Sequence, residues 1–296
     1  MERLWGGREL ETRLGKELPA GKRIGESWEI VDREEAQSVV RQGPWKGQTL
    51  HQLWTEHRAE IFGEVPSEAP RFPILAKLLD AQAELSLQVH PGDGVGRKTE
   101  LWYVLAAGAN AKIYYGLKRG VDRAEFETAA RRGEALRLMH QVRVKAGDVL
   151  FTPGGRLHGI GAGNLLVEIQ ENSDTTFRLF DWERVDAEGK PRSLQIEEAL
   201  RATDFGDCEP DILRRPGEEL VRCPHFVVEK WSLDQPRRAS ERAAFALFVC
   251  IKGAVELNGL RLGPGEFFLV PASAGESELR PLTAASSVLR ITLPHR

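Results

Sequence analysis

LSLQVHP, at residues 85–91, has the composition of a short strand, and the PGDG that ends and follows it is strong turn punctuation. Side chains alternate along an extended strand, so Gln88 and His90 are expected on the same face. After the turn, KTELWYV at residues 98–104 begins a second strand-like run, in which Glu100 comes early. An amide, an imidazole and a carboxylate therefore occur close together in the sequence.

A third run supplies another imidazole, because GDVLFTPGGRLH at residues 147–158 passes from a strand pattern through a Gly/Pro turn to His158. We expect Gln88, His90, Glu100 and His158 to meet from three adjacent strands of a β-barrel. Oxygen and nitrogen ligands that leave one position open are typical of catalytic metal sites. Zn²⁺, one per chain, fits best, but two histidines and a carboxylate also serve non-haem Fe(II) oxygenases. Either histidine alone would more often be structural, and the combination favours a metal.

An internal repeat indicates two lobes. GDVLFTP at residues 147–153 aligns with GEFFLVP at residues 265–271. His158 lies five residues after the first proline, and the same offset after the second proline gives Glu276. The second copy therefore keeps the strand and turn but lacks the imidazole.

Many short strands between Gly/Pro turns predict a mainly β fold of two cupin-like jelly-roll lobes with small helical insertions. We expect a metal-binding lobe at residues 1–205 and a degenerate C-terminal lobe without a metal site at residues 206–296. Apolar spacing predicts one helix over residues 49–62 and a helical insertion at about residues 121–140.

Composition excludes several classes of partner. A net charge of −3 over 296 residues gives no electrostatic reason to expect nucleic acid or an anionic membrane. The first residues lack a signal-peptide pattern, and no apolar run approaches membrane-spanning length. Three widely spaced cysteines form neither a disulfide framework nor a CxxC site. We expect a cytoplasmic protein, a monomer or weak homo-oligomer, with a small molecule as its ligand.

Two cations stand in apolar surroundings. Lys77 lies within FPILAKLLD at residues 72–80, where a buried charge needs a partner or an anionic ligand. The alternative is that Lys77 extends out to solvent from a strand end. Arg178 stands among aromatic residues, and its guanidinium could bind a carboxylate, a phosphate or an enediolate. The alternative is a surface ion pair of Arg178 with Asp174 or Asp181.

Taken together, these segments resemble the type I mannose-6-phosphate isomerases in their short bacterial form. The matching segments run in the family's order: WGG at 5–7, GESW at 25–28, FPILAKLLD at 72–80, LSLQVHP at 85–91, KTE and WY within 98–103, PGGRLH at 153–158, and SDTT at 173–176 with Arg178. Two departures stand out. The segment between His90 and Glu100 is shorter than the family's, and Arg97 occupies a position where the family usually has glycine.

The resemblance implies a zinc enzyme that interconverts mannose 6-phosphate and fructose 6-phosphate. The implied residues are the metal ligands Gln88, His90, Glu100 and His158, the catalytic residues Arg178 and Lys98, and the substrate-binding residues Lys77, Ser86, Trp5 and Glu26. Lys77 and Ser86 would face the phosphate, and Lys98 would border the sugar.

Isomerisation through a cis-enediolate needs a base and stabilisation of negative charge on oxygen. A metal and Arg178 would supply the charge stabilisation. Lys98, Glu168 and a metal-bound hydroxide all remain possible bases. Two other functions are considered, a cupin-type metal-dependent oxidoreductase and a non-catalytic sugar-phosphate-binding protein. Neither needs the full set of metal ligands together with Lys77, Ser86 and Arg178.

Overall fold

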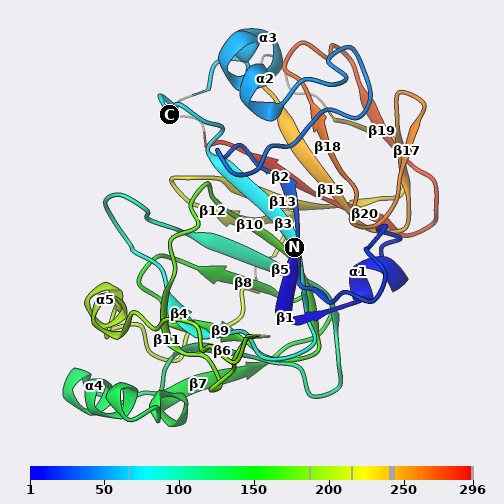
Figure 1. Ribbon diagram of the computed structural model, residues 1–296. Coiled ribbons are helices and arrows are strands. Elements are labelled where there is room, and N and C mark those ends of the chain that lie inside the picture. Colours follow the sequence, from blue (N-terminus) through cyan, green and yellow to red (C-terminus); the bar gives the residue numbers. More distant parts are fainter. Residues whose placement is uncertain (66, 187, 215, 240–243, 295–296) are drawn as a thin grey trace. The chain divides into compact units, whose positions relative to one another are not determined.

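The computed structural model describes residues 1–65, 67–186, 188–214, 216–239 and 244–294 (Figure 1). As predicted, the chain is mainly antiparallel β structure with a few short helices. It divides into two compact units: unit 1 contains Met1–Ser27 and Lys77–Leu213, and unit 2 contains Trp28–Ala76 and Arg214–Arg296. The expected boundary between the catalytic and C-terminal lobes, at residues 205 and 206, stays a prediction.

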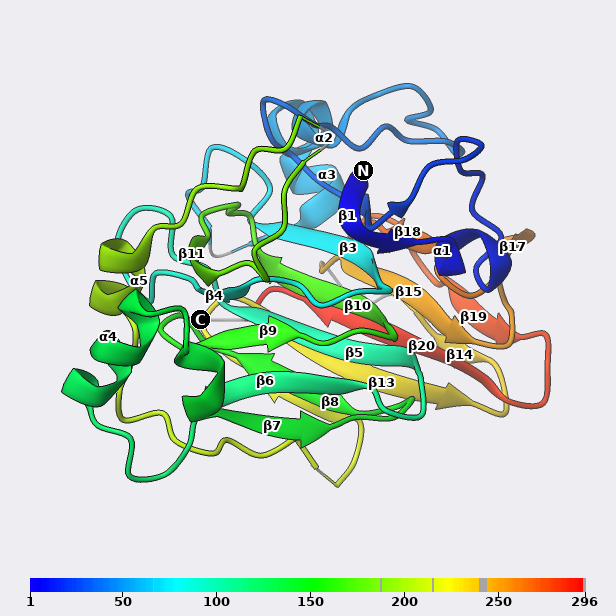
Figure 2. The same ribbon diagram turned by 60° about the horizontal axis from the view of Figure 1, so that its bottom comes forward.

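Unit 1 is built on two sheets, in the strand orders β2-β3-β10-β5-β8 and β11-β4-β9-β6-β7 (Figure 2). The division between the units falls within β2 and β3. The strands of the first sheet are β2 (Glu26–Ile30), β3 (Ile74–Ala81), β10 (Asn164–Glu171), β5 (Glu100–Ala107) and β8 (Val149–Thr152). Those of the second sheet are β11 (Phe177–Phe180), β4 (Leu87–Val89), β9 (His158–Ile160), β6 (Lys112–Leu117) and β7 (Met139–Arg143), and β1 (Glu2–Gly7) precedes them all in the chain.

An apolar core lies between the two sheets of unit 1. It combines Trp102 and Leu166 from the first sheet with Ile113 and Ile160 from the second, all buried. A second apolar cluster covers the opposite face of the β4-containing sheet, where α4 (Arg123–Arg131) and α5 (Ile196–Ala202) pack. These apolar side chains exclude water from much of the interior between the sheets. Polar groups buried next to them therefore lie in a low-dielectric environment.

The helical segments differ in detail from the expectation. The predicted insertion at residues 121–140 is α4 followed by η1 (Ala135–Leu138), and its last two residues, Met139 and His140, already belong to β7. Asp122 caps α4 by accepting a hydrogen bond from the Glu125 backbone N–H at 2.8 Å. Neither α5 nor α1 (Glu9–Thr12) was predicted.

The prediction of one continuous helix over residues 49–62 was wrong. Thr49 and Gln52 form a capping box at the start of α2 (Leu50–Glu56), and α3 (Arg58–Phe62) follows. Between them His57 has φ −123° and ψ 25°, which is not helical. This break lets Phe62 pack edge-on against Trp54, with ring centroids 5.0 Å apart.

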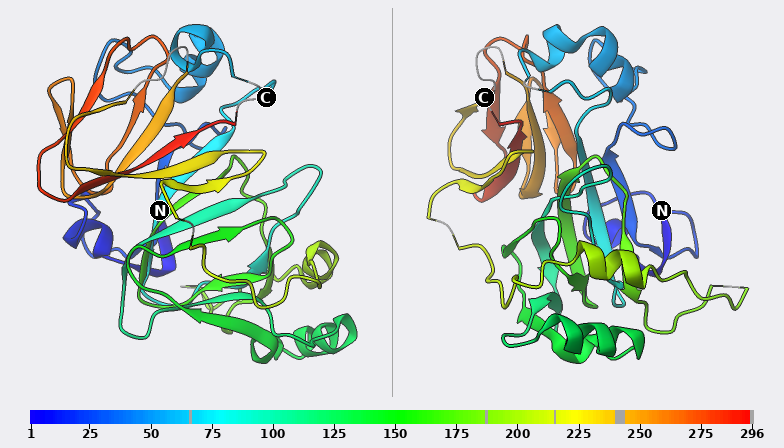
Figure 3. Two further views of the ribbon diagram at one scale, coloured as in Figure 1. Left: turned by 180° about the vertical axis from the view of Figure 1, so that it is seen from behind. Right: turned by 90° about the vertical axis from the view of Figure 1, so that its left-hand side faces the viewer.

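Unit 2 repeats the two-sheet plan in the C-terminal strands, coloured yellow to red in Figure 3. One sheet has the order β12-β13-β20-β15-β18 and the other β14-β19-β16-β17. Their bounds are β12 (Glu219–Arg222), β13 (Val227–Leu233), β20 (Ser286–Thr292), β15 (Ala246–Lys252), β18 (Phe267–Val270), β14 (Arg237–Arg238), β19 (Glu278–Pro281), β16 (Val255–Leu257) and β17 (Leu260–Leu262). The predicted pair of cupin-like jelly-roll sheets is present in both units.

The sequence repeat coincides with equivalent edge strands, because β8 and β18 each end one five-stranded sheet. In unit 1 the residue before the turn proline, Thr152, pairs with Glu100. In unit 2 the equivalent residue, Val270, pairs with Ala246. The position of a predicted metal ligand in unit 1 is therefore taken by alanine in unit 2.

No helix in the described part of the chain has both the length and the apolar character needed to span a membrane.

The turn that leads to His158 depends on close backbone contact. A Cβ on Gly154 would overlap the Pro91 carbonyl oxygen and lie 2.5 Å from Gly92 Cα. We therefore expect Gly154→Ala to lower the free energy of unfolding by about 1–3 kcal/mol, since backbone must move. Gly108→Ala is the control, because the nearest atom to a Cβ there is the Gly163 carbonyl oxygen, at an ordinary contact distance of 3.7 Å. Thermal melts of both variants measure this, and equal melting temperatures would contradict the expectation.

Candidate metal centre and active site

The four predicted metal ligands come from both sheets of unit 1. Gln88 on β4 pairs directly with His158, the first residue of β9, and His90 follows β4. Glu100 begins β5 in the other sheet. The prediction of three adjacent strands was therefore wrong, because the two sheets of a jelly roll face each other and the ligands meet across the interior.

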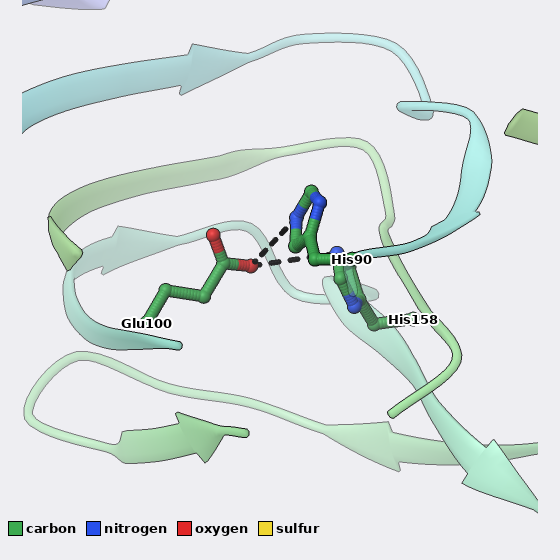
Figure 4. A group of neighbouring side chains, drawn as sticks. All are labelled: His90, Glu100 and His158. Atoms are coloured by element: carbon green, nitrogen blue, oxygen red, sulfur yellow. Dashed lines mark ion pairs between the residues drawn. The ribbon is translucent and has the colours of Figure 1, made fainter. Parts of the chain in front are cut away.

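Glu100 and the two histidines turn their polar atoms toward one another (Figure 4). Glu100 Oε1 lies 3.5 Å from His90 Nε2 and 3.4 Å from His158 Nε2. Each of the three side chains is about 1% exposed. One nitrogen from each ring and one carboxylate oxygen therefore lie close together in a buried space.

Backbone carbonyls set the proton positions on both rings. His90 Nδ1 lies 2.8 Å from the Thr175 carbonyl oxygen, and His158 Nδ1 lies 2.9 Å from the Arg156 carbonyl oxygen. A carbonyl only accepts hydrogen bonds, so Nδ1 carries the hydrogen and the neutral ring presents a lone pair at Nε2.

Burial also favours the neutral rings. It lowers the pKa of His158 to about 3 and, together with Lys98, lowers the pKa of His90. Burial opposes ionisation of Glu100, but the Lys98 ammonium outweighs it and holds the pKa of Glu100 well below its usual range. A carboxylate oxygen and two imidazole lone pairs therefore face each other, an arrangement that fits a divalent metal ion.

Gln88, the fourth predicted ligand, lies beside this group. Its amide Nε2 lies 3.2 Å from His158 Nε2, and its Oε1 accepts a hydrogen bond from Ser86 Oγ at 3.0 Å. The Ser86 hydroxyl can donate or accept, so a half-turn of the amide keeps this contact and directs Oε1 to the ligand group. Ser86 thus contacts a predicted metal ligand, and its role toward the substrate phosphate stays a prediction.

Lys98 lies directly beside the ligand group and is buried. Its Nζ is 2.8 Å from Glu100 Oε2, 3.2 Å from His90 Nε2 and 3.7 Å from Glu168 Oε1. The ammonium therefore places a positive charge beside the ligand group.

Lys77 is buried and does not extend to solvent. Its Nζ lies 3.0 Å from Glu168 Oε1. Burial alone would lower the pKa of Lys77, but Glu168 outweighs it and raises that pKa. Glu168 also accepts a hydrogen bond from Trp102 Nε1 at 2.9 Å, and the Trp102 ring meets His158 edge-on with centroids 5.2 Å apart. The Glu168 carboxylate thus lies between the two buried ammonium groups and next to the candidate metal-ligand cluster.

Arg178 lies on β11 opposite Gln88 and is half-buried. Within the described residues it forms no ion pair, and its Nε has no hydrogen-bond partner. Asp181, one of the surface partners considered for it, pairs with Arg184 and Arg192 instead. Burial and the nearby Arg192 lower the pKa of Arg178. This guanidinium therefore suits an anionic ligand.

Trp5 and Glu26 are both buried in unit 1. Trp5 belongs to the core between the sheets, and Glu26 forms an ion pair with Arg3 at 2.9 Å. Their roles toward substrate stay predictions. Sequence reasoning missed the hydrogen bond from Trp102 to Glu168, although Trp102 lies within the motif that carries Glu100. It also missed the two carbonyls that orient the histidines, for which the sequence carries no signal.

We expect His158→Ala to lose bound metal after incubation with Zn²⁺ and dialysis, since two donors and a weak amide remain. His57→Ala is the control, because His57 lies at the break between α2 and α3, in unit 2. Elemental analysis of the purified variants measures metal per chain. A fully metallated His158→Ala protein would contradict the ligand assignment.

Comparisons with known proteins identify the family of this chain. Residues 1–114 match the phosphomannose isomerase type I catalytic domain, and residues 218–282 match the mannose-6-phosphate isomerase cupin domain. The mannose-6-phosphate isomerase ManA of Bacillus subtilis (strain 168) is 37% identical over 94% of this chain and 92% of its own length. Mannose-6-phosphate isomerase of Streptococcus mutans is 34% identical over 91% and 89%. The crystal structure of the mannose 6-phosphate isomerase from Bacillus subtilis has a TM-score of 0.88 at 32% identity, covering 99% and 97% of the two chains. The resemblance seen in the sequence is confirmed, and the chain belongs to the type I mannose-6-phosphate isomerase family.

Proposed function

We propose that this protein is a zinc-dependent mannose-6-phosphate isomerase, which interconverts mannose 6-phosphate and fructose 6-phosphate through a cis-enediolate. The observation that carries the proposal is the buried convergence of Glu100 Oε1 with His90 Nε2 and His158 Nε2. Family membership and the catalytic names of the relatives support it. The site lies within residues 1–205, which we take as the catalytic lobe.

Zinc suits these ligands because two neutral imidazoles, a carboxylate and an amide oxygen are nitrogen and oxygen donors that leave a position for substrate. When bound here, Zn²⁺ would polarise the sugar carbonyl and favour charge on its oxygen, an effect of several kcal/mol in metalloenzymes. The carbonyls of Thr175 and Arg156 would hold the two rings in the orientation that such binding needs.

The reaction moves one proton from C2 of the open-chain aldose to C1 and another from O2 to O1. Lys98 Nζ and Glu168 Oε1 lie 3.7 Å apart beside the ligand group, and either atom can hold the transferred proton. The positive charge of Lys98 also stabilises an oxygen that becomes negative in the enediolate. Trp102 orients the carboxylate of Glu168 through its Nε1–H.

Substrate anchoring falls to the cations around the site. Arg178 offers a guanidinium without a carboxylate partner within the described residues, and guanidinium groups bind phosphate or enediolate oxygens in a planar, paired geometry. Lys77 and Ser86 are proposed to face the phosphate, although Lys77 is paired with Glu168 and Ser86 with Gln88 in this structure. Trp5 and Glu26 are proposed to bind the substrate as well, and Lys98 to border the sugar.

We expect purified protein to convert mannose 6-phosphate in a coupled assay, to lose this activity on chelation, and to regain it with Zn²⁺. The reason is that the buried ligand set would be left without the cation that polarises the carbonyl. Turnover that survives complete metal removal would contradict zinc dependence. Oxygen uptake with Fe²⁺ and no isomerisation would instead identify an oxidoreductase, and tight binding without turnover a sugar-phosphate-binding protein.

Replacing Arg178 should separate catalysis from metal binding. We expect Arg178→Ala to lower kcat by about 10²–10³-fold, the usual loss when one charge-stabilising donor is removed. Zinc content should stay at the wild-type level, because Arg178 is not among the ligands. Arg119→Ala is a matched control, since that side chain is 83% exposed. Equal losses of zinc and turnover in Arg178→Ala would refute this role.

A further inference from the structure

Glu171, the last residue of β10, holds the segment that carries Lys98. Its Oε2 accepts a hydrogen bond from the Thr99 backbone N–H at 3.0 Å, and its Oε1 accepts one from Arg97 Nε at 2.7 Å. Its own backbone N–H donates to the Thr99 carbonyl at 3.1 Å. One carboxylate thus fixes the residues on both sides of Lys98.

Lys98 is placed by this arrangement. Its backbone N–H donates to the Pro91 carbonyl at 3.1 Å, which closes the short turn after His90. Its ammonium reaches Glu100 Oε2 at 2.8 Å and His90 Nε2 at 3.2 Å. A flexible four-carbon side chain keeps such contacts only when its backbone is held, since ordering it costs conformational entropy.

The same partner segment also orients His90. Ser173 Oγ donates to the Gly96 carbonyl at 2.9 Å, and the Thr175 carbonyl faces His90 Nδ1 at 2.8 Å. A Cβ on Gly96 would lie 2.5 Å from Thr175 Oγ1, so the two segments are in close contact. Residues 171–175 therefore position a metal ligand and the neighbouring ammonium together.

We propose that Glu171 is a positioning residue for the isomerase reaction, acting through Thr99 and Arg97 to hold the Lys98 ammonium against Glu100 and His90. This inference rests on the proposed function, in which Lys98 is catalytic. The Arg97 guanidinium adds a second bond to the carboxylate that already holds Thr99.

The two bonds to Glu171 differ in burial. Arg97 is 52% exposed, and exposed ion pairs contribute little. The Thr99 N–H is buried and bonds to a charged acceptor, which makes the stronger hydrogen bond. Loss of the Thr99 bond should therefore matter more than loss of the Arg97 pair.

The test compares Glu171→Ala, Glu171→Gln and Arg97→Ala as zinc-loaded enzymes. We expect Glu171→Ala to lower kcat by about 10-fold or more with KM within about twofold of wild type, because a small displacement of a reacting group costs rate. Glu171→Gln keeps an amide oxygen for the Thr99 N–H and should recover most of kcat. The kcat of Arg97→Ala should fall about twofold, and the zinc content should be unchanged in all three variants.

Glu197→Ala is the matched control, because it removes an exposed ion pair, to Arg131, from α5. Hydrogen–deuterium exchange gives a readout apart from activity, and residues 91–99 should exchange faster in Glu171→Ala than in this control. If Glu171→Ala unfolds, Glu171→Gln still carries the test, because it keeps the Thr99 bond and loses only the Arg97 ion pair. Its kcat should then match that of Arg97→Ala, and a kcat about 10-fold or more below that of Arg97→Ala would overturn the proposal. A wild-type kcat in folded Glu171→Ala, or no recovery in Glu171→Gln, would overturn the proposal.

Lys98→Met separates the positioning role of Glu171 from the proposed isomerase function. We expect it to lower kcat, and adding Glu171→Ala to it should cause no further loss, since both changes act through one ammonium. A multiplied loss in the double variant would show that Glu171 acts elsewhere and overturn the positioning role. Wild-type protein without isomerase activity would instead refute the proposed function, while the exchange of residues 91–99 would still report whether Glu171 holds the loop.

Discussion

A buried carboxylate that faces two neutral imidazoles is the interaction on which the rest of the structure depends. Glu100, His90 and His158 are about 1% exposed, and an isolated charge at that depth would be costly. The surroundings compensate for this cost with cations, of which Lys98 lies nearest at 2.8 Å. The strand pairing, the Gly/Pro turn and the carbonyls behind the rings all maintain an arrangement that attracts positive charge, and a divalent metal ion would satisfy it further.

Much of this site could be predicted because its ligands obey local rules. The alternation of a strand places Gln88 and His90 together, and the turn at Gly154 directs His158 to pair with Gln88. The side of the barrel that supplies Glu100 could not be predicted, because the sheet to which a strand belongs depends on long-range topology. The contacts of Trp102 and the carbonyl behind each histidine are tertiary and leave no pattern in the sequence.

The two units share a two-sheet framework but carry different side chains at equivalent positions. When the units are aligned by the register of β8 and β18, the cross-strand pair Trp102–Glu168 in unit 1 corresponds to the cross-strand pair Phe248–Arg290 in unit 2. Arg290 pairs with Glu229, so unit 2 also encloses an ion pair, with the charge on β20 opposite to that on β10. The sequence repeat showed the shared strand and the missing histidine, whereas this exchange of charge became visible only in the strand register.

The charges of unit 1 also bear on substrate class. Glu168 takes Lys77 as its near partner, and Glu100 takes Lys98, so each carboxylate already has one cation. Arg178 is left without an anion among the described residues, and burial makes its charge more costly to keep unpaired. A neutral sugar would not relieve that cost, whereas a phosphorylated one would. The same imbalance that destabilises the free site would therefore favour binding of a sugar phosphate over the parent sugar.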